Sequence, residues 1–239
     1  MSTNVDHIID RFRLKKSLNF WRILGIFSII GMCLVATVRF DVLPNEPHLA
    51  RLKVGGLIVD DADRNEILTN IVEDDAIRAL IVHLDSPGGT FVGGERLFKH
   101  LMRVGKAKPL VVIIGNTGTS AAYLAAISAE RIFIQEGSIT GSIGVILQTA
   151  DVTELMKKLG VKPEVIKSDP LKAQPSPMEP FSNEARSMIH DVILDLHEIF
   201  VENVATRRSL SLDQARSLSK GQIFTGRQAV ALGLVDAIG

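Results

Sequence analysis

The sequence predicts an α/β domain preceded by one transmembrane helix, and three observations support this prediction. From residue 49 onward, short apolar runs rich in β-branched residues alternate with amphipathic stretches, as is typical of α/β domains. A segment without any charged residue follows a basic start. The length of 239 residues and the 46% hydrophobic content are sufficient for a buried core. We expect a basic cytoplasmic stub at 1–22, a transmembrane anchor at 23–38, a linker at 39–48 and one domain at 49–239.

The uncharged segment 23–38 is the first predicted element. As a helix it measures about 24 Å, and residues 20–40 reach roughly 31 Å, enough for a bilayer core if Arg22 and Arg39 extend to the interface. Up to Asp41 the chain has six Lys or Arg residues and three Asp or Glu, so this part carries +3 and the remainder −3. Basic residues before the span orient the amino terminus to the cytoplasm and the domain to the other side.

Three alternatives for this segment are weaker. A signal peptide cleaved after Ala36 would place Leu34 where a small residue is required. A lipoprotein site at Cys33 would follow Met32 rather than a small residue. A buried helix of a soluble core would not explain the basic flank and the apolar residues on every side.

The later elements follow from their periodicity and caps. Strands are predicted at 52–59, 79–84, 110–114, 131–134, 143–147 and 164–167. Helices are predicted at 64–74, 94–104, 121–128, 153–159, 183–208, 212–218 and 226–232. In the longest helix, apolar residues near a 3.6-residue spacing, such as Val192 and Leu196, predict a surface helix packed on the sheet. Four prolines within 168–180 exclude regular structure there, and a loop of this length is often functional.

Composition excludes several classes of function. A net charge of zero and 5% aromatic residues argue against nucleic acid as a partner. A single cysteine excludes an intramolecular disulfide and a multi-cysteine zinc site. Motifs for zinc proteases, nucleoside triphosphates and dinucleotides are absent, so we expect no metal and no cofactor. His190 and His197 are too far apart for one metal without other ligands, and His83 with Asp85 gives only weak support to a Ser-His-Asp site.

Three glycine-rich segments each follow a predicted strand. The first reads DSPGG at 85–89, where two glycines let a backbone N–H approach a ligand closely. The second, 115–123, contains Ser120 at the start of a helix, where a hydroxyl lies near unpaired N–H groups. As an isolated feature, Ser120 is also explained as a simple helix cap. The third segment, 137–145, alone could be only a tight connection.

Taken together and in order, these segments resemble the signal peptide peptidase A proteases of the ClpP/crotonase superfamily. The resemblance covers residues 49–239 and rests on SPGG at 86–89, SAAY at 120–123, TGSIGV at 140–145, a lysine-containing loop at 167–177 and a closing GLVD-x-x-G at 233–239. It implies a ClpP/crotonase-like spiral of ββα units. The chain has one set of these motifs, like the short form of the family.

The resemblance also implies a site and a mechanism. Ser120 would be the nucleophile of a Ser-Lys dyad and Lys172 the general base, with the hydroxyl of Ser142 orienting the lysine. The backbone N–H groups of Gly89 and Ala121 would form the oxyanion hole. A lysine is a base only when neutral, and burial favours that form. Without the serine motif, Lys172 would be interpreted as a solvated cation of the loop. Lys167 is the alternative candidate for the general base.

One departure concerns the two residues after the nucleophile, which are usually glycines in the family and are Ala121 and Ala122 here. Short-form relatives are similar in assembling as rings in which serine and lysine can come from neighbouring subunits, so a homo-oligomeric ring is expected.

The function implied is that of a serine endopeptidase anchored in the bacterial inner membrane as a single-pass protein, with its protease domain on the periplasmic side. Its substrates would be peptides: cleaved signal peptides and misfolded exported or membrane proteins, with apolar segments favoured. Two alternatives remain at this point. One is a crotonase-like acyl-CoA enzyme, and the other is a non-catalytic membrane scaffold with the same fold.

Overall fold

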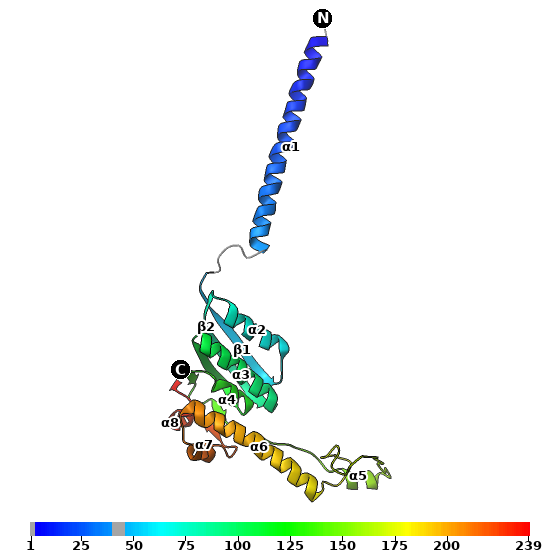
Figure 1. Cartoon of the computed structure of the whole chain (residues 1–239), viewed down its shortest axis with the longest axis vertical. Helices are drawn as coiled ribbons and strands as arrows, with labels where there is room; N and C mark the ends of the chain where they lie inside the picture. Colours follow the sequence, from blue (N-terminus) through cyan, green and yellow to red (C-terminus); the bar gives the residue numbers. More distant parts are fainter. Residues whose placement is uncertain (1–2, 40–45) are drawn as a thin grey trace. The chain divides into compact units, whose positions relative to one another are not determined.

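The computed structural model describes the backbone of residues 3–39 and 46–239 and the side chains of residues 14–35 and 46–239 (Figure 1). The chain divides into two compact units, Met1–Pro47 and His48–Gly239. The predicted linker at 39–48 lies largely outside the described residues, as do most side chains of the basic stub.

The described residues of the amino-terminal unit contain the helix α1 (Thr3–Arg39), which begins earlier than the predicted span at 23–38. Within it, Leu14–Val35 is long and apolar enough to cross a membrane, at about 33 Å for 1.5 Å per residue. None of this segment is buried within the described residues, and side chains such as Phe27 and Met32 are exposed. By its length and composition, this helix is a candidate membrane span.

The second unit is built on a parallel sheet with the strand order β1-β2-β3-β4-β7. These strands are β1 (His48–Ile58), β2 (Ile77–Gly89), β3 (Leu110–Thr119), β4 (Arg131–Ile134) and β7 (Ala237–Ile238). Beyond them, β5 (Ile139–Gly141) pairs in parallel with the end of β3, and β6 (Ile223–Thr225) pairs antiparallel with β5. Parallel neighbours require crossover connections, which here contain α2 (Ala62–Glu73), α3 (Phe91–Ala107) and α4 (Ala121–Ala126).

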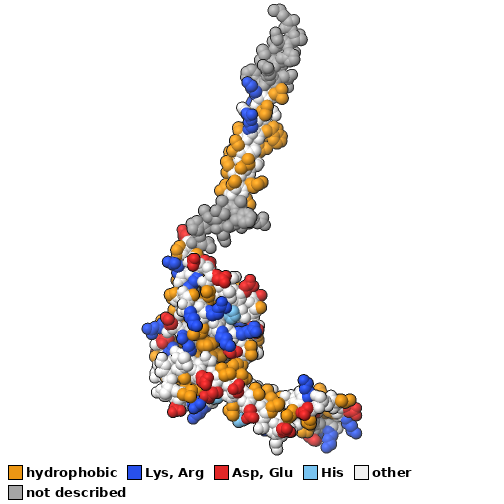
Figure 2. Space-filling model, in the orientation of Figure 1, with side chains coloured by type: hydrophobic (Ala, Val, Ile, Leu, Met, Phe, Trp, Pro, Cys, Tyr) orange, Lys and Arg blue, Asp and Glu red, His pale blue; other side chains and the backbone are white. Residues whose placement is uncertain are grey.

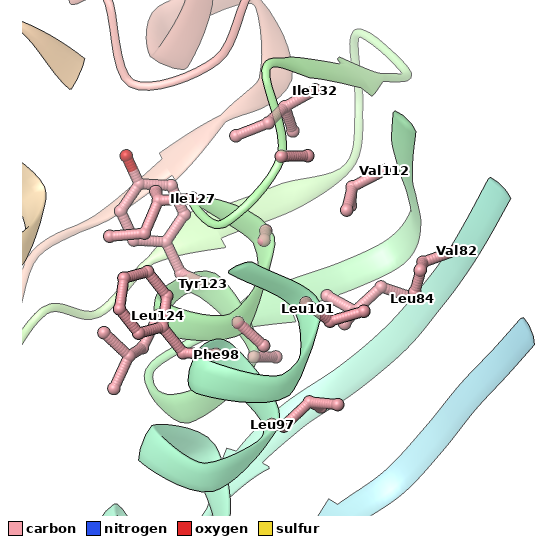
Figure 3. Packing of buried hydrophobic residues seen from close by; sticks show 14 of the residues in the cluster. Val82, Leu84, Leu97, Phe98, Leu101, Val112, Tyr123, Leu124, Ile127 and Ile132 are labelled. Atoms are coloured by element: carbon pink, nitrogen blue, oxygen red, sulfur yellow. The ribbon is translucent and has the colours of Figure 1, made fainter. Parts of the chain in front are cut away.

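The core lies between this sheet and the helices α3 and α4 (Figure 3). Leu97 and Leu101 of α3 are fully buried, as is Val82 of β2. Tyr123 of α4 is also fully buried, and its hydroxyl donates a 2.8 Å hydrogen bond to the carbonyl of Leu234. Burial raises the pKa of the Tyr123 phenol, so this group stays a neutral donor. These contacts hold α4, and therefore the residue before it, in a fixed place.

The remaining helices are α5 (Thr153–Lys158), α6 (Asn183–Arg208), α7 (Leu212–Leu218) and α8 (Gly226–Ala231). The carboxyl-terminal half of α6 packs on the domain through Phe200, Val201 and Val204, all buried. In its amino-terminal half Val192 and Leu194 are 52% and 50% exposed. The predicted packing of α6 on the domain therefore holds only for its second half.

We call residues 146–194 the arm, because α5 and the first half of α6 extend beyond the sheet and its covering helices (Figure 1). Its surface carries many apolar side chains (Figure 2). The exposed large ones are Ile146, Leu147, Leu155, Leu159, Val161, Val165, Ile166, Met178, Val192 and Leu194. An apolar surface of this extent is typical of a surface that contacts another molecule.

Two predicted strands, 143–147 and 164–167, are wrong. Both runs contain adjacent Val and Ile residues, but neither pairs with a strand among the described residues: Ile146 is 80% exposed and Ile166 is fully exposed. The edge of β3 is instead taken by β5, a run of only three residues. β6 is equally short and was not predicted, because three residues are too few to show a period of two.

Candidate active site

Ser120 occupies the turn between β3 and α4. Its backbone has φ +54° and ψ −125°, a conformation with positive φ that residues other than glycine rarely adopt. The Ser120 N–H donates a 2.8 Å hydrogen bond to the carbonyl of Gly141, and this bond holds the turn against β5. The side chain makes no capping bond to α4. The interpretation of Ser120 as a helix cap that bonds to α4 through its side chain is therefore not supported, and Ser120 lies in a strained turn.

The SPGG turn at 86–89 packs directly against this serine. A side chain at Gly88, where φ is +112°, would place its Cβ 2.8 Å from the Cβ of Ser120. A Cβ at Gly89 would lie 1.9 Å from the carbonyl oxygen of Ile58. Gly88 is therefore required for the close approach of this turn to Ser120, and Gly89 for its close approach to β1. Ser86, fully buried, donates to the Gly56 carbonyl at 2.6 Å and accepts from the N–H of Gly88 at 3.1 Å.

Ser142 lies beside the same turn, on the segment that leaves β5. Its neighbour Gly141 pairs with Thr119 and accepts the hydrogen bond from the Ser120 N–H. Ser142 also has a positive φ of +50°, and its own N–H donates to the carbonyl of Gln222 at 2.6 Å. The structure therefore brings Ser120, Gly89, Ala121 and Ser142 together.

A cavity of about 260 Å³ opens at Ser120. Most of the other side chains that line it are apolar and come from four separate parts of the chain. They are Phe91, Ala121, Leu124, Val145, Ile146, Leu196 and Phe200. A cavity of this composition accepts an apolar side chain of a ligand. Of its lining residues, Phe91 and Phe200 were not identified from the sequence, although Phe200 lies four positions after Leu196 and so shares its helix face.

Lys172 does not line this cavity. It lies in a turn of the proline-rich loop, where its N–H donates to the carbonyl of Asp169 at 3.0 Å, and its side chain is exposed. The competing lysine, Lys167, is 12% exposed and forms a 2.6 Å ion pair with Glu179.

The place of this loop explains the separation from Ser120. The loop ends at the amino terminus of α6, whose cap is Ser182, whereas the cavity at Ser120 contacts α6 at Leu196 and Phe200. Fourteen residues of α-helix measure about 21 Å. Within one chain, the structure does not bring Lys172 and Ser120 together.

Among the described residues, no histidine lines the cavity at Ser120. His83 and Asp85 line a different cavity, together with Asn116 and Ser138. On α6, His197 is bonded to the carbonyl of Ser219 at 2.7 Å and His190 is exposed. Within the described part of the chain, no group of three or more His, Cys, Asp or Glu residues is arranged to hold a metal ion.

Ala121, which follows Ser120 where the resemblance led us to expect a glycine, is accommodated by a residue that the sequence did not reveal, Gly94 of α3. A Cβ at Gly94 would lie 2.7 Å from the Cβ of Ala121 and 3.1 Å from its backbone. Helices α3 and α4 therefore approach closely only because one of the two facing positions is a glycine.

This contact predicts opposite effects for the same substitution at two places in α3. Gly94→Ala is expected to destabilise the protein by about 1–3 kcal/mol, because α3 must move away from α4. Gly105→Ala is expected to stabilise it by about 0.5–1 kcal/mol, because a Cβ there meets its nearest neighbour at 3.6 Å and alanine favours helix. Urea unfolding of the full chain measures both. Equal effects of the two substitutions on the free energy of unfolding would contradict the proposed contact. So would a double variant in which Ala121→Gly does not recover part of the stability lost in Gly94→Ala.

Comparison with known proteins identifies the fold first. A ClpP1 mutant of Listeria monocytogenes superposes with a TM-score of 0.54 at 14% identity, covering 79% of this chain and 90% of that one. The predicted ClpP-like α/β fold, preceded by an apolar helix, is confirmed. The domain therefore belongs to the class of ClpP-like folds.

Sequence comparison identifies the family. The model of peptidase family S49 matches residues 103–239. A protein of Synechocystis sp. named as a protease is 36% identical over 80% of this chain and 69% of its own length. An Enterococcus faecium protein named as a signal peptide peptidase SppA is 31% identical over 80% of this chain and 60% of its own length. The chain belongs to peptidase family S49 and is a serine-type peptidase. This confirms the resemblance found in the sequence.

Proposed function

We infer that this protein is a membrane-anchored endopeptidase in which Ser120 is the nucleophile and Lys172 of a neighbouring subunit is the general base. The observation that carries this proposal is the Ser120 turn: a strained serine beside a glycine turn, opening on an apolar cavity. Membership of a peptidase family argues against the acyl-CoA alternative.

The chemistry follows from the positions of the groups. The Ser120 hydroxyl attacks the carbonyl carbon of the scissile bond while a neutral lysine amine takes its proton. The N–H of Ala121 belongs to the first turn of α4 and has no partner within that helix, so it is available to the developing oxyanion. The N–H of Gly89, held close by the SPGG turn, is the second donor. The protonated lysine then donates to the leaving amine, and water hydrolyses the acyl-enzyme.

A second copy of the chain would supply the lysine. Lys172 is exposed and remote from the Ser120 of its own chain, and it lies on the arm with its extensive apolar surface. Contact between the arm and a neighbouring subunit would bury that surface and remove the amine from water, which favours its neutral form. Ser142, beside Ser120, offers a hydroxyl to orient the incoming amine.

Substrates are proposed from the cavity and from the anchor. An apolar cavity of about 260 Å³ favours an apolar side chain next to the scissile bond. The segment Leu14–Val35 would hold the enzyme in the bacterial inner membrane, and the preceding basic residues would keep the amino terminus in the cytoplasm. Cleaved signal peptides and apolar segments of misfolded exported or membrane proteins meet both conditions.

The test of this function is chemical labelling of the full chain in detergent micelles. A fluorophosphonate probe is expected to modify Ser120, as read by mass spectrometry of the labelled peptide, and an apolar signal peptide is expected to be cleaved faster than a polar peptide of equal length. A probe that modifies another serine would contradict the assignment of the nucleophile. Equal cleavage of the two peptides would contradict the substrate class.

A further inference from the structure

The pairing of β2 with β3 is interrupted at one residue, Asp85. Leu84 of β2 pairs with Ile114 of β3. Ser86 lies two residues further along β2, but its partner Gly118 lies four residues further along β3. The three residues 115–117 therefore lie opposite Asp85 alone. Such an insertion is a β-bulge, and bulges near active sites redirect the strand that contains them.

This bulge is where β3 changes its neighbour. Before it, Ile114 pairs with Ile134 of β4; from its last residue, Thr117, onward, β3 pairs with β5, beginning at Ile139. Ser120 follows β3 directly, so the bulge decides where the nucleophile lies. The SPGG turn begins at the residue after Asp85, so the bulge also lies at the base of the segment proposed to stabilise the oxyanion.

The carboxylate of Asp85 accepts hydrogen bonds from two residues of the bulge. Its Oδ1 accepts the backbone N–H of Thr117 at 3.0 Å, and its Oδ2 accepts the side-chain amide of Asn116 at 2.6 Å. The remaining residue of the bulge, Gly115, leaves room for the Asp85 carboxylate, because a Cβ at Gly115 would lie 3.2 Å from Cγ and Oδ2 of Asp85. The hydrogen bond from Asn116 holds the pKa of the Asp85 carboxyl below its usual value, and the N–H of Thr117 acts in the same direction.

We propose that Asp85 is a positioning residue, which fixes the distance between the Ser120 turn and the Gly89 N–H by holding the bulge of β3. The proposal rests on the proposed function. Asp85 does not line the cavity at Ser120 and has no part in the reaction itself. Its effect is on geometry: an error of about 1 Å in the placement of a reacting group can cost a hundredfold in rate.

The test compares two substitutions of Asp85 in the full chain. Asp85→Ala removes both hydrogen bonds and is expected to lower kcat roughly 10- to 100-fold with little change in KM, because the apolar cavity is untouched. Asp85→Asn is expected to recover most of kcat. Its amide oxygen still accepts from Thr117, and the amide of Asn116 can turn its oxygen toward the new donor. Fluorophosphonate labelling of Ser120 is expected to slow in the same order.

A matched control removes a similar bond elsewhere. Asp74, in the turn between α2 and β2, accepts the N–H of Ala76 at 2.8 Å, and Asp74→Ala is expected to leave kcat unchanged. If Asp85→Ala does not fold, Asn116→Ala replaces it, because that side chain is exposed and contributes one of the two bonds.

Each outcome decides the proposal. A kcat that falls at constant KM, and recovers in Asp85→Asn, supports it. Folded Asp85→Ala or Asn116→Ala with wild-type kcat overturns it, while the proposed function stands. An effect confined to KM also overturns it, because positioning of the nucleophile acts on the chemical step. A wild-type chain that neither labels nor cleaves overturns the proposed function and this proposal with it.

Discussion

Ser120→Ala is expected to abolish peptide hydrolysis by the full chain, with a loss in kcat on the order of 10⁴- to 10⁶-fold and no fluorophosphonate labelling. The reason is that the proposed acyl-enzyme forms on the Ser120 hydroxyl, which alanine lacks. Oxyanion donors and substrate binding remain in the variant, so a small residual rate over water is expected. Peptide cleavage followed by fluorescence, with labelling on gels, measures both quantities.

The variant must be folded for this result to be interpreted. Ser120 contributes no capping bond to α4, so removal of its hydroxyl is expected to leave the thermal unfolding temperature close to that of the wild type. Ser217→Ala, at an exposed serine of α7, is the matched control and is expected to remain fully active. Residual cleavage above a hundredth of the wild-type rate in Ser120→Ala would show that another residue is the nucleophile.

The second large effect is the rescue of one inactive variant by another. Ser120→Ala and Lys172→Ala are each expected to be inactive alone. In rings assembled at random from equal amounts of both, about a quarter of the sites would combine an intact Ser120 from one chain with an intact Lys172 from its neighbour. Peptide hydrolysis by the co-expressed, differently tagged variants is therefore expected to return to about a quarter of the wild-type rate.

This experiment separates a shared site from a site within one chain. If both residues belonged to the same chain, mixing would restore nothing. Lys162→Ala, at another exposed lysine of the arm, is the control for loss of a loop cation and is expected to retain activity. A mixture that stays inactive, although each variant sediments as the wild-type assembly does, would contradict a shared site.

Local sequence signals predicted several elements well, for identifiable reasons. The helix at 183–208 has the predicted bounds, because Ser182 caps its amino terminus and its apolar spacing is regular. β4 also has its predicted bounds, 131–134, because a buried strand is a short apolar run. In contrast, the runs at 143–147 and 164–167 also contain consecutive β-branched residues but do not form strands. A strand depends on a partner that is remote in the sequence, and composition does not reveal whether that partner exists.

The candidate site was predicted only as separate pieces. The sequence indicated Ser120, Gly89 and Ser142 on three different segments, and the structure brings these segments side by side through the pairing of β3 with β2 and β5. Two supporting residues were not predicted as such. Gly94 leaves room for Ala121, the alanine that it faces, and Asp85 bonds to a bulge in the neighbouring strand. Both depend on contacts between segments distant in the chain, and such contacts leave no periodic signal.

The sequence by itself determined the class of fold, the apolar helix and the residue types of a serine peptidase. Periodicity, caps and glycine turns are properties of neighbouring residues, so they can be read in the chain. Only the tertiary structure decided which faces are covered and which side chains meet. It leaves the arm apolar and uncovered, and it keeps Lys172 away from the Ser120 of the same chain. The physical reason is that burial and proximity depend on the packing of remote segments, and that packing brings one half of α6, but not the other, onto the domain.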